Sequence, residues 1–166
     1  MTDHHASCAC GKVQIAFIGA PVAVLSCCCD DCQRAAAALE ALPGAPGYTE
    51  PCGGSPVALY HRKAMKVISG GDQLEPHKLH PGSPTSRMVA RCCNSAMHIG
   101  FDKGPFWVTA FLARMGRTAP EPAYRIQTKF LPEPPPGDMP NYPTFPKSLM
   151  GRIAWAGLTG LLRRPA

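Results

Sequence analysis

Cysteine is the residue type whose number and spacing stand out in this chain. The sequence has nine cysteines, and eight of them fall into three separated groups. The groups read Cys8-Ala9-Cys10-Gly11, Cys27-Cys28-Cys29-Asp30-Asp31-Cys32 and Cys92-Cys93-Asn94, while Cys52 stands alone. Thiolates that lie a few residues apart on a tight turn can bind one zinc ion. Because an odd count does not fit a complete disulfide framework, the pattern favours metal binding.

The middle group has a further property that bears on chemistry. Cys27, Cys29 and Cys32 offer three thiolates at the start of an expected helix, where the helix dipole favours the ionised thiol. Three protein ligands leave one position of a tetrahedral zinc open, as in zinc sites that meet a substrate or a water. The alternative is that Cys27, Cys28 and Cys29 pack as small apolar side chains. Cys52 is either a fourth ligand or an exposed spectator thiol, and the second interpretation is favoured.

Three segments of the chain resemble the glutathione-dependent formaldehyde-activating enzyme family, which also includes centromere protein V. They are Cys8-x-Cys10-Gly11, Cys27-x-Cys29-x-x-Cys32-Gln33-Arg34 and residues 87–95, so the resemblance spans about residues 8–112. The Cys-Cys-Asn knuckle is most similar to a bacterial branch of that superfamily. The resemblance implies a structural zinc at the first and last groups, and a second, more labile zinc associated with catalysis at the middle group.

The last group departs from the family pattern. Ala90 stands where the family has its third structural ligand, and Cys92 is the candidate substitute. The alternative is a three-cysteine site completed by water or histidine, because adjacent cysteines are awkward on one ion. His4 and His5 are close enough to Cys8 to donate a ligand but are interpreted as a disordered terminus. The predicted metal ligands are Cys8, Cys10, Cys92 and Cys93 for one site and Cys27, Cys29 and Cys32 for the other, with one to two zinc ions per chain.

The resemblance also implies a reaction. The family adds glutathione to formaldehyde and forms S-hydroxymethylglutathione. The first hypothesis is therefore that this chain is an enzyme, a carbon–sulfur lyase with a small thiol such as glutathione as its partner. Two other hypotheses stay open. A zinc-stabilised binding or scaffold protein would close the middle site with a fourth protein ligand. A thiol redox or metal-buffering protein would use Cys28, Cys52 or Cys92 as spare thiols.

The elements that position the cysteines are predicted to be short strands. Val13, Ile15 and Phe17 alternate with polar or small residues, which is typical of a half-buried strand. Asp30 or Asp31 can cap a helix over residues 33–42. Further short apolar runs occur at 22–25, 57–60, 65–69, 77–80, 87–91, 96–101 and 106–112. The predicted fold is therefore mainly β, and the resemblance implies a small zinc-pinned antiparallel β-tent, similar to Mss4.

The remaining third of the chain is expected to lie outside this β domain, which covers residues 1–115. Nine prolines fall within residues 116–146, so this segment is predicted to be an extended arm without regular ladders. Residues 147–166 are predicted to form an amphipathic helix with Arg163 and Arg164 at its end. Its buried anchors would be Trp155 and Leu158, docking on its own domain or on a second copy of the chain as a homo-oligomer.

Length, composition and charge exclude several classes of protein. The chain has 166 residues, and 19 prolines with 16 glycines exclude a helical bundle. The net charge of +6 comes from scattered basic residues, mostly C-terminal, so nucleic-acid binding is not favoured. The start lacks the features of a signal peptide, which predicts a cytoplasmic protein with reduced cysteines. A membrane span is excluded because the last apolar stretch is short and contains Arg152.

Overall fold

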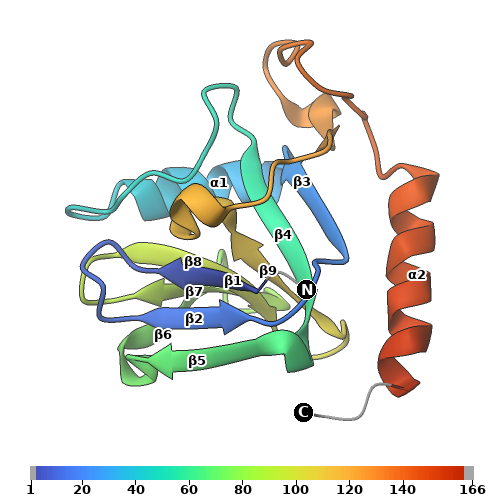
Figure 1. Ribbon diagram of the computed structural model, residues 1–166. Coiled ribbons are helices and arrows are strands. Elements are labelled where there is room, and N and C mark those ends of the chain that lie inside the picture. Colours follow the sequence, from blue (N-terminus) through green and yellow to red (C-terminus); the bar gives the residue numbers. More distant parts are fainter. Residues whose placement is uncertain (1–2, 163–166) are drawn as a thin grey trace.

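The computed structural model describes residues 3–162 of the chain, which form two β-sheets and two α-helices (Figure 1). The smaller sheet has the order β1-β2-β5 and the larger sheet the order β10-β3-β4-β9-β8-β7-β6. All neighbouring strands are antiparallel except β10 and β3, which are parallel. The strands are β1 His4–Ser7, β2 Gln14–Phe17, β3 Ala23–Cys27, β4 Ser55–His61, β5 Met65–Ser69, β6 Leu74–His77, β7 Thr85–Ala90, β8 Ser95–Phe101, β9 Trp107–Phe111 and β10 Arg125–Ile126.

The two helices are α1, Asp30–Glu40, and α2, Lys147–Leu162. The first follows the middle cysteine group directly, and the second stands beside β3 and β4 in Figure 1. The prediction of a mainly β fold with one short helix after the middle group and one C-terminal helix is therefore confirmed. No helix within residues 3–162 combines the length and the apolar character needed to cross a membrane.

Strand β4 lies between two apolar cores because its side chains alternate between the two faces of the larger sheet. Ala58 and Tyr60 join the core that connects the two sheets, where the Tyr60 ring stacks on Phe17 with centroids 4.7 Å apart. Val57 and Leu59 join the core on the opposite face, under both helices. The cysteine groups lie at the borders of these two cores.

Two segments that were expected to be irregular are ordered. His4 lies in β1, is buried and shares a hydrogen bond of 3.0 Å with the hydroxyl of Tyr60. The prediction of a disordered start at His4 and His5 is therefore wrong, since pairing of β1 with β2 satisfies its backbone. Arg125 lies in β10, which pairs with β3 although it belongs to the proline-rich segment. The expectation that this segment holds no ladder is wrong over these two residues.

The edge strand β6 also differs from its prediction. It covers Leu74–His77 rather than residues 77–80, because a turn begins at His80, whose carbonyl accepts a hydrogen bond from the Ser83 amide. The backbone around residues 78–83 therefore turns towards β7, which starts at Thr85.

Helix α2 contacts the domain through other side chains than those predicted. Leu149 is 1% exposed and Ile153 is partly buried, one turn apart on the same face. Trp155 is 69% exposed and Leu158 is 64% exposed, so they are not its anchors within the chain. The prediction failed because α2 has apolar residues on several faces, which leaves the buried face undetermined by pattern. Arg163 and Arg164 lie outside the described residues.

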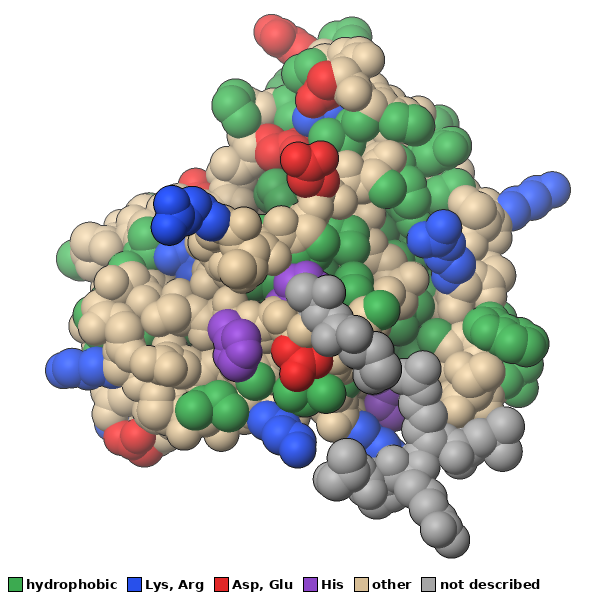
Figure 2. Space-filling view, in the orientation of Figure 1, with side chains coloured by type: hydrophobic (Ala, Val, Ile, Leu, Met, Phe, Trp, Pro, Cys, Tyr) green, Lys and Arg blue, Asp and Glu red, His purple; other side chains and the backbone are tan. Residues whose placement is uncertain are grey.

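Charged side chains are dispersed over the face of the molecule seen in Figure 2. Lys and Arg side chains occur singly there, separated by polar, apolar and acidic groups, rather than gathered in one basic patch. This face therefore offers no concentrated positive field for a polyanion.

Candidate metal centres and the adjoining cavity

The first and last cysteine groups meet in space. The loop after β1 carries Cys8 and Cys10, and the turn between β7 and β8 carries Cys92 and Cys93. Their four sulfur atoms lie within 4.8 Å of one another. The Sγ–Sγ distances are 3.6 Å for Cys8–Cys10, 3.9 Å for Cys8–Cys92, 3.3 Å for Cys10–Cys92 and 3.9 Å for Cys92–Cys93. Both adjacent cysteines thus face the same centre.

Two tight turns make this arrangement possible. Gly11 has a φ of +78° and its amide donates a hydrogen bond to the Cys8 carbonyl at 2.9 Å, a conformation that favours glycine. Asn94 has a φ of +52° directly after the adjacent cysteines. Ser95 then ties the turns together, because its hydroxyl accepts a hydrogen bond from the Ala9 amide at 3.0 Å and contacts the Cys93 sulfur at 3.1 Å.

The middle group is built where β3 passes into α1. Cys27 ends β3, Cys29 is the N-cap of α1 and Cys32 lies in its first turn. The three sulfurs lie within 4.8 Å of one another, and the Cys27 thiol donates to the Cys29 sulfur at 3.5 Å. No other Cys, His, Asp or Glu among the described residues joins this group.

Cys28, which directly follows β3, does not belong to this group, and its sulfur lies beside Gly54 and Glu50 instead. Its side chain is fully buried, and burial is the main reason that the pKa of its thiol rises to about 12. Cys52 also lies beside Glu50, and its thiol donates to the Glu50 carboxylate at 3.4 Å. Glu50 is held by Arg125 at 2.9 Å. Cys52 is therefore partly buried and hydrogen-bonded rather than a fourth member of the middle group.

The three thiols of the middle group shift one another's pKa. Hydrogen bonds from Cys27 and Cys32 lower the pKa of Cys29 to about 3. The same contact with Cys29 raises the pKa of Cys27 to about 12, and contacts with Cys27 and Cys29 raise that of Cys32. A divalent cation among these sulfurs would stabilise all three as thiolates, because a bound metal deprotonates its thiol ligands.

Arg87 supplies the positive charge next to the middle group. Its side chain on β7 is 4% exposed, and it donates hydrogen bonds to the Thr85 hydroxyl at 3.2 Å and to the Asp31 carbonyl at 3.3 Å. No carboxylate of the described residues forms an ion pair with it. The guanidinium therefore offsets the charge of the thiolates. Arg87 was known from the sequence only as part of the resembling segment, without a role.

Both groups have a donor set that suits zinc. A tetrahedral zinc with Zn–S bonds of about 2.3 Å places its sulfurs about 3.7 Å apart. Five of the contacts between these sulfurs are 3.3 to 3.9 Å long, and within each group all the sulfurs lie within 4.8 Å of one another. The four-cysteine group fills a tetrahedron, whereas the three-cysteine group leaves one position for another ligand. The chain can thus hold two metal ions in sites of different kinds.

A cavity of about 360 Å³ opens directly beside the middle group. Cys27, Cys29 and Cys32 line part of it. The remaining wall is mostly apolar and comes from both the larger sheet and the C-terminal segment. Its apolar members are Leu25, Val57, Leu59, Ile99, Phe101, Trp107, Ile126, Phe145, Leu149 and Ile153. The pattern of the sequence did not indicate that α2 forms part of this wall.

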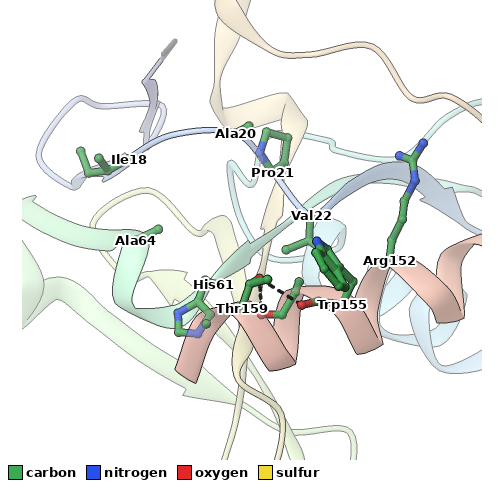
Figure 3. Close-up of a pocket in the computed structure, with 11 residues that line it drawn as sticks. Ile18, Ala20, Pro21, Val22, His61, Ala64, Arg152, Trp155 and Thr159 are labelled. Carbon is green, nitrogen blue, oxygen red and sulfur yellow. Dashed lines mark hydrogen bonds between the residues drawn. The ribbon is translucent and has the colours of Figure 1, made fainter. Parts of the chain in front are cut away.

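A second cavity of similar volume, about 360 Å³, lies where the last turns of α2 approach the segment between β2 and β3. Figure 3 shows Trp155 and Thr159 from the helix opposite Pro21 and Val22, with His61 at one end. The Thr159 hydroxyl is directed along its own helix and donates to the Trp155 carbonyl at 3.0 Å. No cysteine lines this cavity.

Fold and cysteine geometry together define a small β protein with one closed and one open thiolate site. Residues 3–45 match the model of the family described as glutathione-dependent formaldehyde-activating enzyme. The matched segment contains the first and middle cysteine groups, so the match confirms the resemblance inferred from these motifs. The similarity to a branch with a Cys-Cys-Asn knuckle stays a prediction, because residues 92–94 lie outside that segment.

Comparison with solved structures finds a Rhodobacter sphaeroides protein of known crystal structure. It is 16% identical in sequence, with a TM-score of 0.48, and the alignment covers 70% of this chain and 91% of that chain. Comparison with curated proteins finds no match.

Proposed function

We propose that the chain binds zinc at both cysteine groups and that the middle group carries out carbon–sulfur chemistry on a small thiol. One observation carries this proposal: Cys27, Cys29 and Cys32 form a three-sulfur group that lines a cavity, so a ligand in the cavity can take the fourth position of a tetrahedral zinc. A binding or scaffold protein would instead close this group with a fourth protein ligand. Cys52, the candidate for that role, is hydrogen-bonded to Glu50.

The reaction proposed is the addition of a thiol to formaldehyde, and its reverse. The thiol sulfur forms a bond to the carbonyl carbon, the π electron pair of the carbonyl moves to oxygen, and the thiol proton ends on that oxygen. A zinc ion held by Cys27, Cys29 and Cys32 supplies a Lewis acid that binds a thiol sulfur and favours its deprotonated form. The apolar walls exclude water, and the buried Arg87 balances negative charge at the sulfur end.

The four-cysteine group has a different proposed role. Cys8, Cys10, Cys92 and Cys93 surround their centre and leave no open position, which is typical of structural zinc. We propose that this site stabilises the fold, because it joins the start of the chain to the turn between β7 and β8. Location in the cytoplasm stays a prediction.

The test measures formation of the thiol–formaldehyde adduct. Zinc-loaded protein is mixed with formaldehyde and a panel of thiols (glutathione, 2-mercaptoethanol and benzyl mercaptan), and the S-hydroxymethyl adduct is followed against the spontaneous reaction. We expect acceleration with at least one thiol, its loss in Cys29→Ser and its retention in Cys52→Ser. Rates equal to buffer for every thiol, or full activity in Cys29→Ser, contradict the proposal.

A further inference from the structure

We infer that the thiol accepted at the middle group has an apolar body, aryl or alkyl, rather than a charged peptide body. This inference rests on the proposed function, because it concerns what occupies the cavity beyond the sulfur. The observation is a combination: three cysteines in the wall of the cavity, and a wall that is otherwise formed mainly by aliphatic and aromatic side chains.

The charged side chains lining the cavity are few and adjoin the middle cysteine group. Among the described residues of the wall, only Arg87 and Asp31 are ionisable apart from the cysteines. The Asp31 side chain is 63% exposed and pairs with Arg34 at 2.8 Å. Arg87 is held by Thr85 and the Asp31 carbonyl, beside the thiol group. Apart from Arg87 and Asp31, the described wall therefore offers no charged side chain to a ligand.

Glutathione fits this distribution poorly. It carries two carboxylates and one ammonium at neutral pH, whereas the cavity offers a single buried cation that already faces the thiolates. Desolvating an ion without a partner costs several kcal/mol in a protein interior. A phenyl ring or a short alkyl chain incurs no such cost and gains free energy in proportion to the apolar surface it buries.

The volume of the cavity and the aromatic residues in its wall further restrict which apolar thiols fit. A volume of about 360 Å³ lies at the low end for ligand cavities, which range over roughly 300–1,000 Å³. Trp107 is half-buried in this wall and meets the Phe101 ring edge-on with centroids 5.7 Å apart. Such aromatic edges favour contact with another ring. A single ring bearing a thiol, as in benzyl mercaptan, matches these dimensions.

Helix α2 supplies part of the cavity wall, so its side chains help to determine which thiol binds. Leu149 and Ile153 of α2 complete the wall opposite β3 and β4. Ile153 is partly buried, so a substitution there changes the cavity at low risk to the fold. Met150, on the same helix, is 53% exposed and does not line the cavity, which makes it the matched control position.

The test compares binding of benzyl mercaptan, N-acetylcysteine and glutathione to the zinc-loaded full chain by calorimetry. Trp107 fluorescence in a Trp155→Phe background serves as a second readout, because Trp155 does not line this cavity. We expect benzyl mercaptan to bind at least about tenfold more tightly than either charged thiol. Ile153→Lys should weaken benzyl mercaptan by about tenfold and strengthen glutathione, while Met150→Lys changes neither.

The outcomes separate this inference from the function on which it rests. If glutathione binds as tightly as benzyl mercaptan, or if Ile153→Lys leaves the preference unchanged, the inference of an apolar thiol is wrong. The proposed thiol-binding site is not contradicted by either result. Benzyl alcohol binding as tightly as benzyl mercaptan overturns recognition of sulfur, and with it the proposed function. Circular dichroism and the melting temperature of each variant establish that the fold is retained.

Discussion

The two cysteine groups should differ in what they contribute to stability, and the structure gives the size of the difference. Cys10 and Cys92 are 82 residues apart, whereas Cys27 and Cys32 both lie at the junction of β3 and α1. A cross-link stabilises a fold mainly by restricting the unfolded chain, and the effect grows with the loop that it closes. If each metal site is treated as a cross-link, closing a loop of this length stabilises the fold by about 4.5 kcal/mol. Closing a loop of about six residues stabilises it by about 2 kcal/mol.

The perturbation is a pair of double variants. Cys10→Ser with Cys92→Ser leaves two ligands at the four-cysteine group and removes only exposed or partly exposed sulfurs. Cys29→Ser with Cys32→Ser is the matched change at the middle group, where both residues are also partly exposed. We expect the first variant to lose about 2.5 kcal/mol more of its unfolding free energy than the second.

The assay is urea denaturation at equal zinc activity, followed by circular dichroism, with each chain repeated after chelation. Chelator should reduce the wild type to the stability of the first variant or below. Equal losses in the two double variants, or a first variant as stable as the wild type, would refute the assignment of a structural role to Cys8, Cys10, Cys92 and Cys93.

Two further predictions concern the buried side chains of His98 and Leu149. Burial lowers the pKa of His98 from 6.5 to about 4. As the pH falls, the unfolded chain therefore protonates this imidazole before the folded chain does. The free energy of unfolding should fall as the pH drops from 6.5 towards 4, by about 2 kcal/mol at pH 5. His98→Leu should remove that part of the slope in urea titrations between pH 7 and pH 5, and an unchanged slope contradicts the argument. Leu149 is 1% exposed and Leu158 is 64% exposed, so Leu149→Ala should cost about 2–4 kcal/mol and Leu158→Ala less than about 0.5 kcal/mol. Equal thermal shifts for these two variants would show that α2 does not dock through Leu149.

Much of the site was predictable because its information is local. Spacing alone grouped Cys27, Cys29 and Cys32, since a strand end followed by a helix start brings such neighbours together. The resemblance paired Cys8 and Cys10 with the distant Cys93, and the geometry adds Cys92, which had been one of two alternatives. The short strands followed from residues that alternate in polarity.

The parts that escaped prediction depend on tertiary contacts. His4 is buried because β1 pairs with β2 and meets Tyr60, which a four-residue segment cannot reveal. The strand at Arg125 exists because Glu50 and Asp138 hold that side chain against β3 despite the surrounding prolines. The face of α2 that is buried is chosen by the shape of the domain. For the same reason, the sequence pattern did not predict that Ile153 lines the cavity.

The central claim is that a substrate sulfur binds in the open position beside Cys27, Cys29 and Cys32. Replacement of zinc by Co²⁺ tests it most directly, because each thiolate bound to cobalt adds intensity to the sulfur-to-cobalt charge-transfer absorption in the near ultraviolet. We predict that benzyl mercaptan increases this absorption in the wild type and in Cys52→Ser, and that the increase is absent in Cys29→Ser. A spectrum unchanged by saturating thiol in the cobalt-loaded wild type would contradict the account.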